Sequence, residues 1–344
     1  MEIDDQKCAR KHLSKLGFAF FAGTILIIAL EFGIGFIFGL IHPDGNYDYG
    51  SYVVWNMLVR FLIGYPLMIL MILLVKKGAP IPQKNMKLGN VLTAFVMAYA
   101  LAMVSNVIGV LITSIANALK SGAFENSLQD TMFSLNPFWL ILFVCVGAPV
   151  FEELIFRKAL VDRAVYCGEG AAILLSGIMF GLFHGNLNQF IYAAALGAFL
   201  AFVYIRTGKI QYTIILHALV NTMGVIGTLC LEMVMAGGDD LFGDLELVSM
   251  TYTEEFTRLL ADPISGVLFL MGTIGLCGWF LLVVILTITG VIFWILKGKK
   301  LFLLPSRQIS IPKGKRFAAI FLNPGMLCFE IIWILIIFSS MFIG

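Results

Sequence analysis

Long apolar runs dominate this chain and alternate with short polar stretches. Nine such runs cover residues 16–40, 53–75, 88–118, 138–158, 171–189, 190–205, 211–235, 264–296 and 318–343. Most of them approach or exceed the ~20 residues that an α-helix needs to cross a bilayer. We therefore expect an all-α fold, a polytopic bundle of about 8–9 transmembrane helices.

Composition agrees with this interpretation. The chain is 60% hydrophobic and 13% charged, whereas soluble domains contain about 25% charged residues. A net charge of +2 argues against nucleic acid as a partner. The six cysteines form no CxxC pattern, so neither a disulfide framework nor a cysteine metal site is expected. The sequence predicts an integral membrane protein whose surroundings are the lipid bilayer.

Positive charge is concentrated in alternate connections between the apolar runs. Most Lys and Arg residues fall in the segments 7–15, 76–87, 157–163, 206–209 and 297–316. Because cytoplasmic loops carry an excess of Lys and Arg, this separation predicts a cytoplasmic N-terminus. We see no internal repeat and no soluble domain, so residues 1–344 are expected to form a single membrane domain.

Three neighbouring apolar runs contain polar side chains at one-turn spacing. They are Glu152, Glu153 and Arg157, then Phe180 and His184, then His217 and Asn221. Residues three or four apart lie on one face of a helix, so each run offers a polar group to one side. Ionisable side chains are costly in hydrocarbon and usually serve a function there. This pattern predicts a polar site buried in the bundle.

The residue types indicate hydrolysis of an acyl bond by one of two routes. A buried glutamate suits a general base, and a neighbouring histidine could orient the water or share its proton. A second histidine and an asparagine could donate hydrogen bonds to the developing oxyanion. Alternatively, Glu152, His184 and His217 could ligate zinc and polarise a water molecule.

The three motifs resemble the signatures of the CPBP intramembrane proteases. That family includes the CAAX prenyl endopeptidases and the bacterial Abi proteins, some of which are tied to bacteriocin processing and self-immunity. The linking stretch Leu196–Gly208 is also similar to the family's glycine-containing helix and its Arg-Thr-Gly turn. The resemblance extends from about Pro149 to Gly224, inside a motif-bearing core at 138–235. The flanking helices, 16–118 and 264–343, match no pattern that we can name.

The resemblance implies roles for four catalytic residues. Glu152 would activate the attacking water, and His184 would assist it. His217 and Asn221 would form the oxyanion-stabilising pair. This assignment implies an intramembrane endopeptidase that needs no cofactor, with the zinc route as the alternative.

Three further residues would support the site. Glu153 and Arg157 would hold the motif helix in place, next to Phe180 of the second motif. The implied substrate is a membrane-associated peptide or small membrane protein, either prenylated or of leader type. The implied location is the bacterial plasma membrane.

Two other functions also fit a polar site in a membrane bundle. One is a non-catalytic binding or immunity protein. The other is an ion-coupled transporter, whose ion path would consist of the histidines together with Glu31, Glu152, Glu153, Glu232 and Glu330. Against a transporter, the two halves of the chain show no matching pattern. In addition, Glu31 and Glu330 are expected to have no basic partner nearby.

Overall fold

The described part of the protein is an all-helical membrane bundle. The computed structural model describes residues 2–120, 127–242, 263–304, 311 and 313–342. Within these ranges every regular element is a helix, and 7 helical stretches are long and apolar enough to cross a membrane. Two shorter apolar helices, Glu169–Leu182 and Pro324–Ser340, accompany them. The expected all-α polytopic membrane bundle is confirmed.

The helices fall into three consecutive groups along the chain. The first group comprises α1 (Glu2–Ile41), α2 (Tyr49–Val59), η1 (Arg60–Gly64), α3 (Tyr65–Leu73), α4 (Leu88–Lys120) and α5 (Ser127–Ser134). The motif region comprises α6 (Pro137–Leu140), η2 (Ile141–Gly147), α7 (Ala148–Glu153), η3 (Leu154–Val161), α8 (Asp162–Ala164), η4 (Val165–Cys167), α9 (Glu169–Leu182), α10 (Leu187–Thr207) and α11 (Ile210–Phe242). The last group comprises α13 (Pro263–Lys297), η5 (Gly298–Lys300), η6 (Lys313–Lys315), α14 (Arg316–Ile320) and α15 (Pro324–Phe342).

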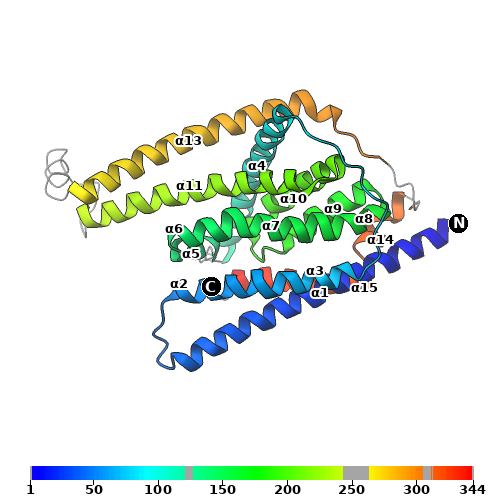
Figure 1. Ribbon diagram of the computed structural model, residues 1–344, viewed down its shortest axis with the longest axis horizontal. Coiled ribbons are helices and arrows are strands. Elements are labelled where there is room, and N and C mark those ends of the chain that lie inside the picture. The colour runs from blue at the N-terminus through cyan, green and yellow to red at the C-terminus, as the bar shows by residue number, and fades with distance from the viewer. Residues whose placement is uncertain (1, 121–126, 243–262, 305–310, 312, 343–344) are drawn as a thin grey trace.

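Flanking helices lie on two sides of the motif-bearing helices, and one of them, α13, packs against the motif-bearing helix α11. Helices α11 and α13 run side by side along one edge of the molecule, whereas α1 and α15 pack together along the opposite edge (Figure 1). Between these edges, η3 contacts α3, α9 and α10, and α10 also packs against α4. Segments far apart in the sequence therefore enclose the motif region from both sides.

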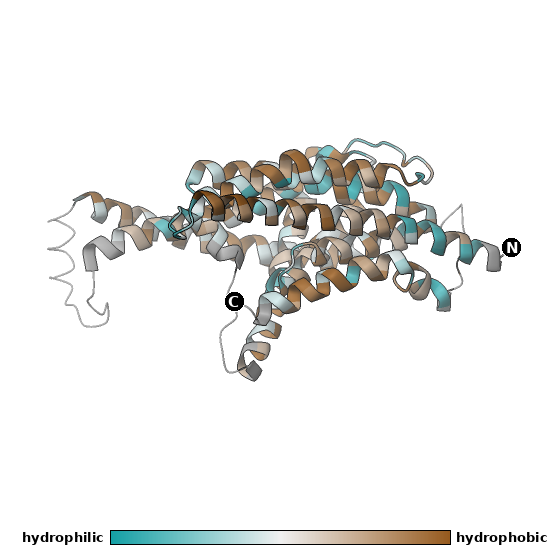
Figure 2. Ribbon diagram, turned by 90° about the horizontal axis from the view of Figure 1, so that it is seen from below, coloured by the Kyte–Doolittle hydropathy of each residue, from teal (hydrophilic) through white to brown (hydrophobic). Residues whose placement is uncertain are grey.

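Apolar side chains cover the outer faces of the flanking helices. Figure 2 shows hydrophobic residues along the bodies of the long helices and hydrophilic ones near their ends and in the loops. Phe32 of α1, Phe280 of α13 and Leu335 of α15 are among the exposed large hydrophobic residues. Such surfaces suit contact with lipid, so the protein is an integral membrane protein.

The second span and the motif span each contain a π-helical turn just before a proline. The π segment η1 ends at Gly64 and η2 ends at Gly147. In each case a proline, Pro66 or Pro149, follows two residues later. In both places the backbone N–H after the π segment bonds to the carbonyl five residues earlier. Proline has no N–H and crowds the preceding turn, so a local π turn relieves the helix there. π turns often occur at functional sites.

Small residues bring α9 and α10 into close contact. A Cβ atom on Gly177 would lie 2.7 Å from the carbonyl oxygen of Ala194, and one on Gly181 would lie 2.7 Å from that of Phe190. Glycine removes this clash and lets the two backbones approach, as small residues do at membrane helix interfaces. This close packing fixes the position of the second motif, which α9 carries.

The boundary between α9 and α10 differs from the sequence-based expectation. The apolar runs suggested a break at 189/190, but α9 ends at Leu182 and α10 begins at Leu187. Gly185 adopts a positive φ of 63° in the intervening turn, and the Asn186 side chain accepts a hydrogen bond from the Asn188 N–H at 2.8 Å. Gly185 therefore forms the turn and Asn186 is the N-cap of α10, because Gly and Asn suit these positions.

Candidate active site

The first motif forms a fully buried ion pair. Glu153 ends α7 and Arg157 lies in η3, and the Glu153 Oε2 to Arg157 Nε distance is 3.1 Å. Both side chains are 0% exposed. The spacing predicted this shared face correctly. A buried carboxylate is tolerated only with good partners, and Arg157 supplies the balancing charge.

Arg157 connects the motif helix to its two neighbours. Its Nη2 donates a hydrogen bond to the carbonyl oxygen of Gly197 on α10 at 3.1 Å. Its guanidinium carbon lies 4.7 Å from the ring centroid of Phe180 on α9. Both contacts give the cation favourable surroundings in a dry interior. Arg157 therefore ties together the segments that carry the first two motifs.

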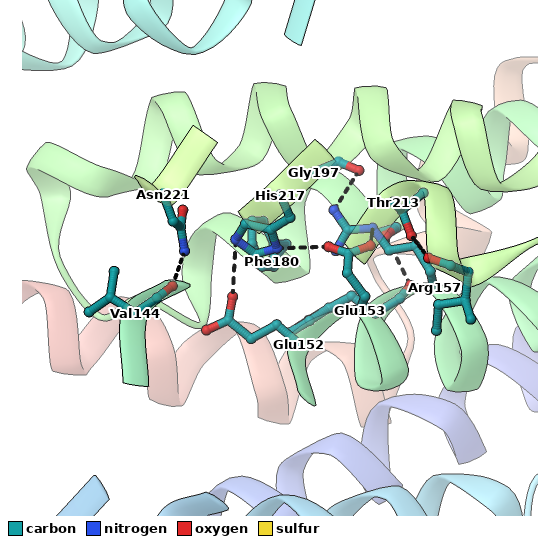
Figure 3. A network of polar contacts seen from close by, with 12 residues as sticks. Val144, Glu152, Glu153, Arg157, Phe180, Gly197, Thr213, His217 and Asn221 are labelled. Atoms are coloured by element: carbon teal, nitrogen blue, oxygen red, sulfur yellow. Dashed lines mark hydrogen bonds and ion pairs between the residues drawn. The ribbon is translucent and has the colours of Figure 1, made fainter. Parts of the chain in front are cut away.

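His217 of α11 lies between the two glutamates of the first motif (Figure 3). Its Nδ1 is 2.9 Å from Oε1 of Glu153, and its Nε2 is 3.8 Å from Oε2 of Glu152. The side chain is only 4% exposed. Because a carboxylate can only accept, the Nδ1–H donates to Glu153 and sets the orientation of the ring. The other ring nitrogen is thereby directed toward Glu152.

Glu152 differs from Glu153 in its surroundings. Its side chain is 13% exposed, and it is Glu153, not Glu152, that forms the ion pair with Arg157. The two adjacent glutamates thus point in different directions, as consecutive residues on a helix must. Glu152 is the carboxylate that keeps access to a ligand or a water molecule.

Asn221 lies one turn after His217 and contacts a backbone carbonyl. Its Nδ2 donates a hydrogen bond to the carbonyl oxygen of Val144 in η2 at 2.9 Å (Figure 3). An amide nitrogen has two N–H donors, so this bond orients the side chain and leaves a second donor.

His184 lies at the turn that follows α9. Its Nδ1 is 2.8 Å from the carbonyl oxygen of Phe180, so this nitrogen donates and Nε2 can accept. The rings of Phe180 and His184 meet edge to face with centroids 4.8 Å apart, and those of Phe180 and His217 do so at 5.6 Å. Phe180 therefore separates and supports the two histidines.

The structure brings the predicted residues into one region, but not all of them into contact. Glu152, Glu153, Arg157 and His217 form a continuous network. Among the described residues, no hydrogen bond joins His184 to Glu152 or to His217. A water molecule or substrate group would have to bridge that gap.

Several contributors to this network were missed in the sequence. The carbonyl groups of Gly197 and Val144 accept key bonds, and backbone acceptors carry no residue-type signal. Thr213 lies beside Glu153 and donates to the Ile210 carbonyl at 3.0 Å (Figure 3). Thr213 is four residues before His217, so the face it shares with that histidine was a usable signal.

The expectation that Glu31 has no basic partner is wrong. Arg60 of η1 forms an ion pair with Glu31 of α1, and its Nε donates to Glu31 Oε1 at 2.8 Å. The two residues are far apart in the sequence, and only the packing of the second span against the first brings them together. No ion pair of Glu330 is found among the described residues.

The positions of the candidate zinc ligands can be compared with what a metal site requires. In the described ranges, no three His, Cys, Asp or Glu side chains lie close enough together to hold a metal ion. His217 and His184 each use Nδ1 for another contact, which leaves one ring nitrogen each for a ligand. The zinc route would require Glu152, His184 and His217 to move closer together.

Comparison with known proteins finds relatives over the motif region. Residues 134–223 match the family described as Type II CAAX prenyl endopeptidase Rce1-like. The putative membrane peptidase YdiL of Bacillus subtilis (strain 168) is 36% identical over 94 residues, which is 26% of this chain and 37% of that protein. Human CAAX prenyl protease 2 is 33% identical over 100 residues, 23% of this chain and 30% of that protein.

These matches are confined to part of each protein. The similarity spans 37% and 30% of the length of these two curated relatives, and no solved structure matches the chain. The matched stretch begins at 134, ahead of the first motif, and so includes the carbonyl that Asn221 contacts. The resemblance inferred from the motifs is confirmed: over residues 134–223 this chain is similar to the Rce1-like CAAX prenyl endopeptidases.

Proposed function

We propose that this protein is an intramembrane endopeptidase that hydrolyses a peptide bond with a water molecule activated by Glu152. One observation carries the proposal. Of two adjacent glutamates, Glu153 is enclosed by Arg157 and His217, whereas Glu152 remains accessible beside the same histidine. A general base needs that access, and the enclosed neighbour provides its support.

The proposed reaction begins with a proton transfer. The Glu152 carboxylate takes a proton from water, and the water oxygen attacks the carbonyl carbon of the scissile bond. The C–N bond then breaks, and the proton moves from Glu152 to the leaving amine. His184 Nε2, as an acceptor, would hold the water in position. Its fixed Nδ1 contact with Phe180 supports this role.

The oxyanion formed in the first step needs hydrogen-bond donors. Asn221 would supply its second amide N–H, because the first is held by Val144. His217 would donate from Nε2 when both of its ring nitrogens carry protons, with Nδ1–H still directed to Glu153. The resemblance to prenyl endopeptidases supports the same division of roles.

The proposed substrate is a membrane-associated peptide or small membrane protein. The curated human relative is a CAAX prenyl protease and the Bacillus relative is a putative membrane peptidase, which supports a peptide substrate of prenylated or leader type. We further propose a bacterial plasma membrane location, on the basis of the family resemblance. The charge distribution supports a cytoplasmic N-terminus.

A cleavage assay in detergent tests this proposal. The wild type, Glu152→Gln, His184→Ala and the control Glu330→Gln would be compared on a prenylated peptide and a peptide library, each with and without a zinc chelator. Glu330 is a part-buried glutamate of α15 outside this network. We expect Glu152→Gln to lower the cleavage rate by about 10²–10⁴-fold. The control should retain it.

The remaining outcomes discriminate among the alternatives. Activity lost to chelator and restored by zinc would assign Glu152, His184 and His217 to a metal site. Equal activity of the wild type and Glu152→Gln would refute the glutamate mechanism. If neither protein cleaves any peptide, and cells that carry Glu152→Gln keep the phenotype of the wild type, a binding or immunity role replaces the peptidase.

A further inference from the structure

A cavity of about 300 Å³ adjoins His184, outside the motif network. Residues of α1, η1, α3 and α15 line it together with the turn between α9 and α10. Its polar lining consists of Thr24, Glu31, Arg60, Tyr65 and His184. The flanking helices, whose role the sequence left open, therefore help to enclose the space next to a candidate catalytic residue.

The turn that carries His184 lies at a depth where exposed backbone is costly. Helix α9 has 14 residues, which corresponds to a length of about 21 Å. A bilayer core is about 30 Å thick, so the turn at His184 and Gly185 falls short of the far boundary. Irregular backbone at membrane depth is tolerated where protein buries it or where it lines a polar cavity. Both turn residues line this cavity.

The Glu31–Arg60 ion pair has hydrogen-bonding capacity left over. Arg60 donates from both Nε and Nη2 to the same oxygen, Glu31 Oε1. Among the described residues, Glu31 Oε2 has no hydrogen-bond partner. Arg60 has five N–H donors, more than this contact uses. The two side chains are 33% and 29% exposed, and both line the cavity.

The pair therefore presents an acceptor and a donor side by side. A free anion would have to compete with Glu31 for Arg60, and a free cation would have to compete with Arg60 for Glu31. A peptide main chain competes with neither, because it offers one N–H and one C=O per residue. Backbone pairing of this kind gives affinity for an extended segment without requiring one particular side chain.

Tyr65 links this pair to the candidate active site. It lines the cavity together with Glu31 and Arg60, and its ring lies 6.0 Å from that of Phe151, next to Glu152 in the chain. His184 adds a second link, because it lines the cavity directly. A chain segment in the cavity would thus lie next to the residues proposed to act on the scissile bond.

We propose that this cavity is a substrate subsite in which Glu31 and Arg60 bind the main chain of an extended peptide segment next to the scissile bond. Glu31 Oε2 accepts a substrate N–H, and a free N–H of Arg60 donates to a substrate C=O. The inference rests on the proposed function and names residues that determine substrate affinity.

Removing the pair without leaving a lone charge tests the subsite. The double variant Glu31→Leu with Arg60→Met would be compared with the matched control Glu169→Leu with Arg206→Met, an ion pair that does not line the cavity. With the peptides that the wild type cleaves, we expect KM to rise about tenfold or more while kcat changes little. The control should keep its KM.

A charge swap distinguishes substrate binding from a purely structural role in which the ion pair only holds α1 and η1 together. The double variant Glu31→Arg with Arg60→Glu keeps an ion pair but exchanges donor and acceptor. We expect its thermal stability in detergent to match the wild type while KM remains raised. A swap variant with wild-type KM would overturn the proposal, since an attachment between α1 and η1 would then explain the pair.

Crosslinking tests the subsite independently of cleavage. A photoreactive amino acid would replace Ile27, which lines the cavity, or Phe280, which is 63% exposed on α13, both in the Glu152→Gln background. The prenylated peptide should crosslink at position 27 and not at 280. Crosslinking there without wild-type cleavage of any peptide would keep the subsite and refute the peptidase. Cleavage without crosslinking at position 27 would refute the subsite alone.

Discussion

Two Glu–Arg ion pairs in this protein differ in what surrounds them. Glu153 and Arg157 are 0% exposed, and their remaining contacts go to His217, Gly197 and Phe180. Glu31 and Arg60 are about a third exposed and face a cavity. The first pair is closed by protein atoms, whereas the second remains open.

This difference separates a supporting role from a binding role. The closed pair is held by His217, Gly197 and Phe180 and has no access to a ligand, so it sets the positions of the three helices around it. An open pair in a membrane keeps polar atoms that only water or a ligand can satisfy. The residue types are the same in both pairs, and the packing alone makes the difference.

Breaking the closed pair should have the largest effect on stability. Arg157→Met would leave the buried Glu153 without its cationic partner and with only the His217 hydrogen bond, and removing one partner of a buried pair costs about 3–5 kcal/mol. We expect a loss of that size in the free energy of unfolding in detergent. The double variant Glu153→Leu with Arg157→Met should recover most of it. Arg206→Met, which breaks a more exposed pair, is the control and should cost under about 1 kcal/mol. Equal losses would contradict the closed-pair assignment.

Removing the oxyanion donor should affect the rate and not the fold. Asn221→Ala is expected to lower kcat by about 10²–10³-fold with little change in KM. Asn56→Ala is a matched control, because Asn56 also donates to a backbone carbonyl at 2.9 Å, that of Tyr52, but lies outside the site. An unchanged kcat for Asn221→Ala would remove this residue from the proposed mechanism.

Adding a methyl group at Gly197, next to the closed pair, should have an intermediate effect on stability. A Cβ on Gly197 would lie 2.8 Å from Cδ1 of Phe180, the ring that covers Arg157. We expect Gly197→Ala to reduce the free energy of unfolding by about 1–3 kcal/mol and to lower cleavage. Gly224 has no heavy atom within 4 Å of a built Cβ, so Gly224→Ala should be neutral. Equal behaviour of the two variants in thermal unfolding would contradict the packing argument.

Removing the open pair should have the smallest effect on stability. The double variant Glu31→Leu with Arg60→Met replaces the ions by apolar groups of similar size, which is often neutral. We expect a change under about 1 kcal/mol in the free energy of unfolding, measured in the same detergent. A loss as large as that of Arg157→Met would show that the pair is mainly structural.

The sequence by itself was sufficient for features that depend on local spacing. Apolar run lengths predicted the membrane helices, since a span must match the bilayer thickness. One-turn spacing predicted that Glu153 faces Arg157 and that Phe180 faces His184, and both pairs are in contact. Helical geometry is nearly the same in every protein, so these relations need no knowledge of the rest of the chain.

Only the tertiary structure decided which segments meet. Glu31 and Arg60 are on different helices, so no spacing rule relates them, and their pairing depends on how the second span packs against the first. The same is true of His217 between two glutamates and of the Gly197 carbonyl that accepts from Arg157. Contacts between helices depend on crossing geometry and on backbone atoms, and residue type specifies neither one.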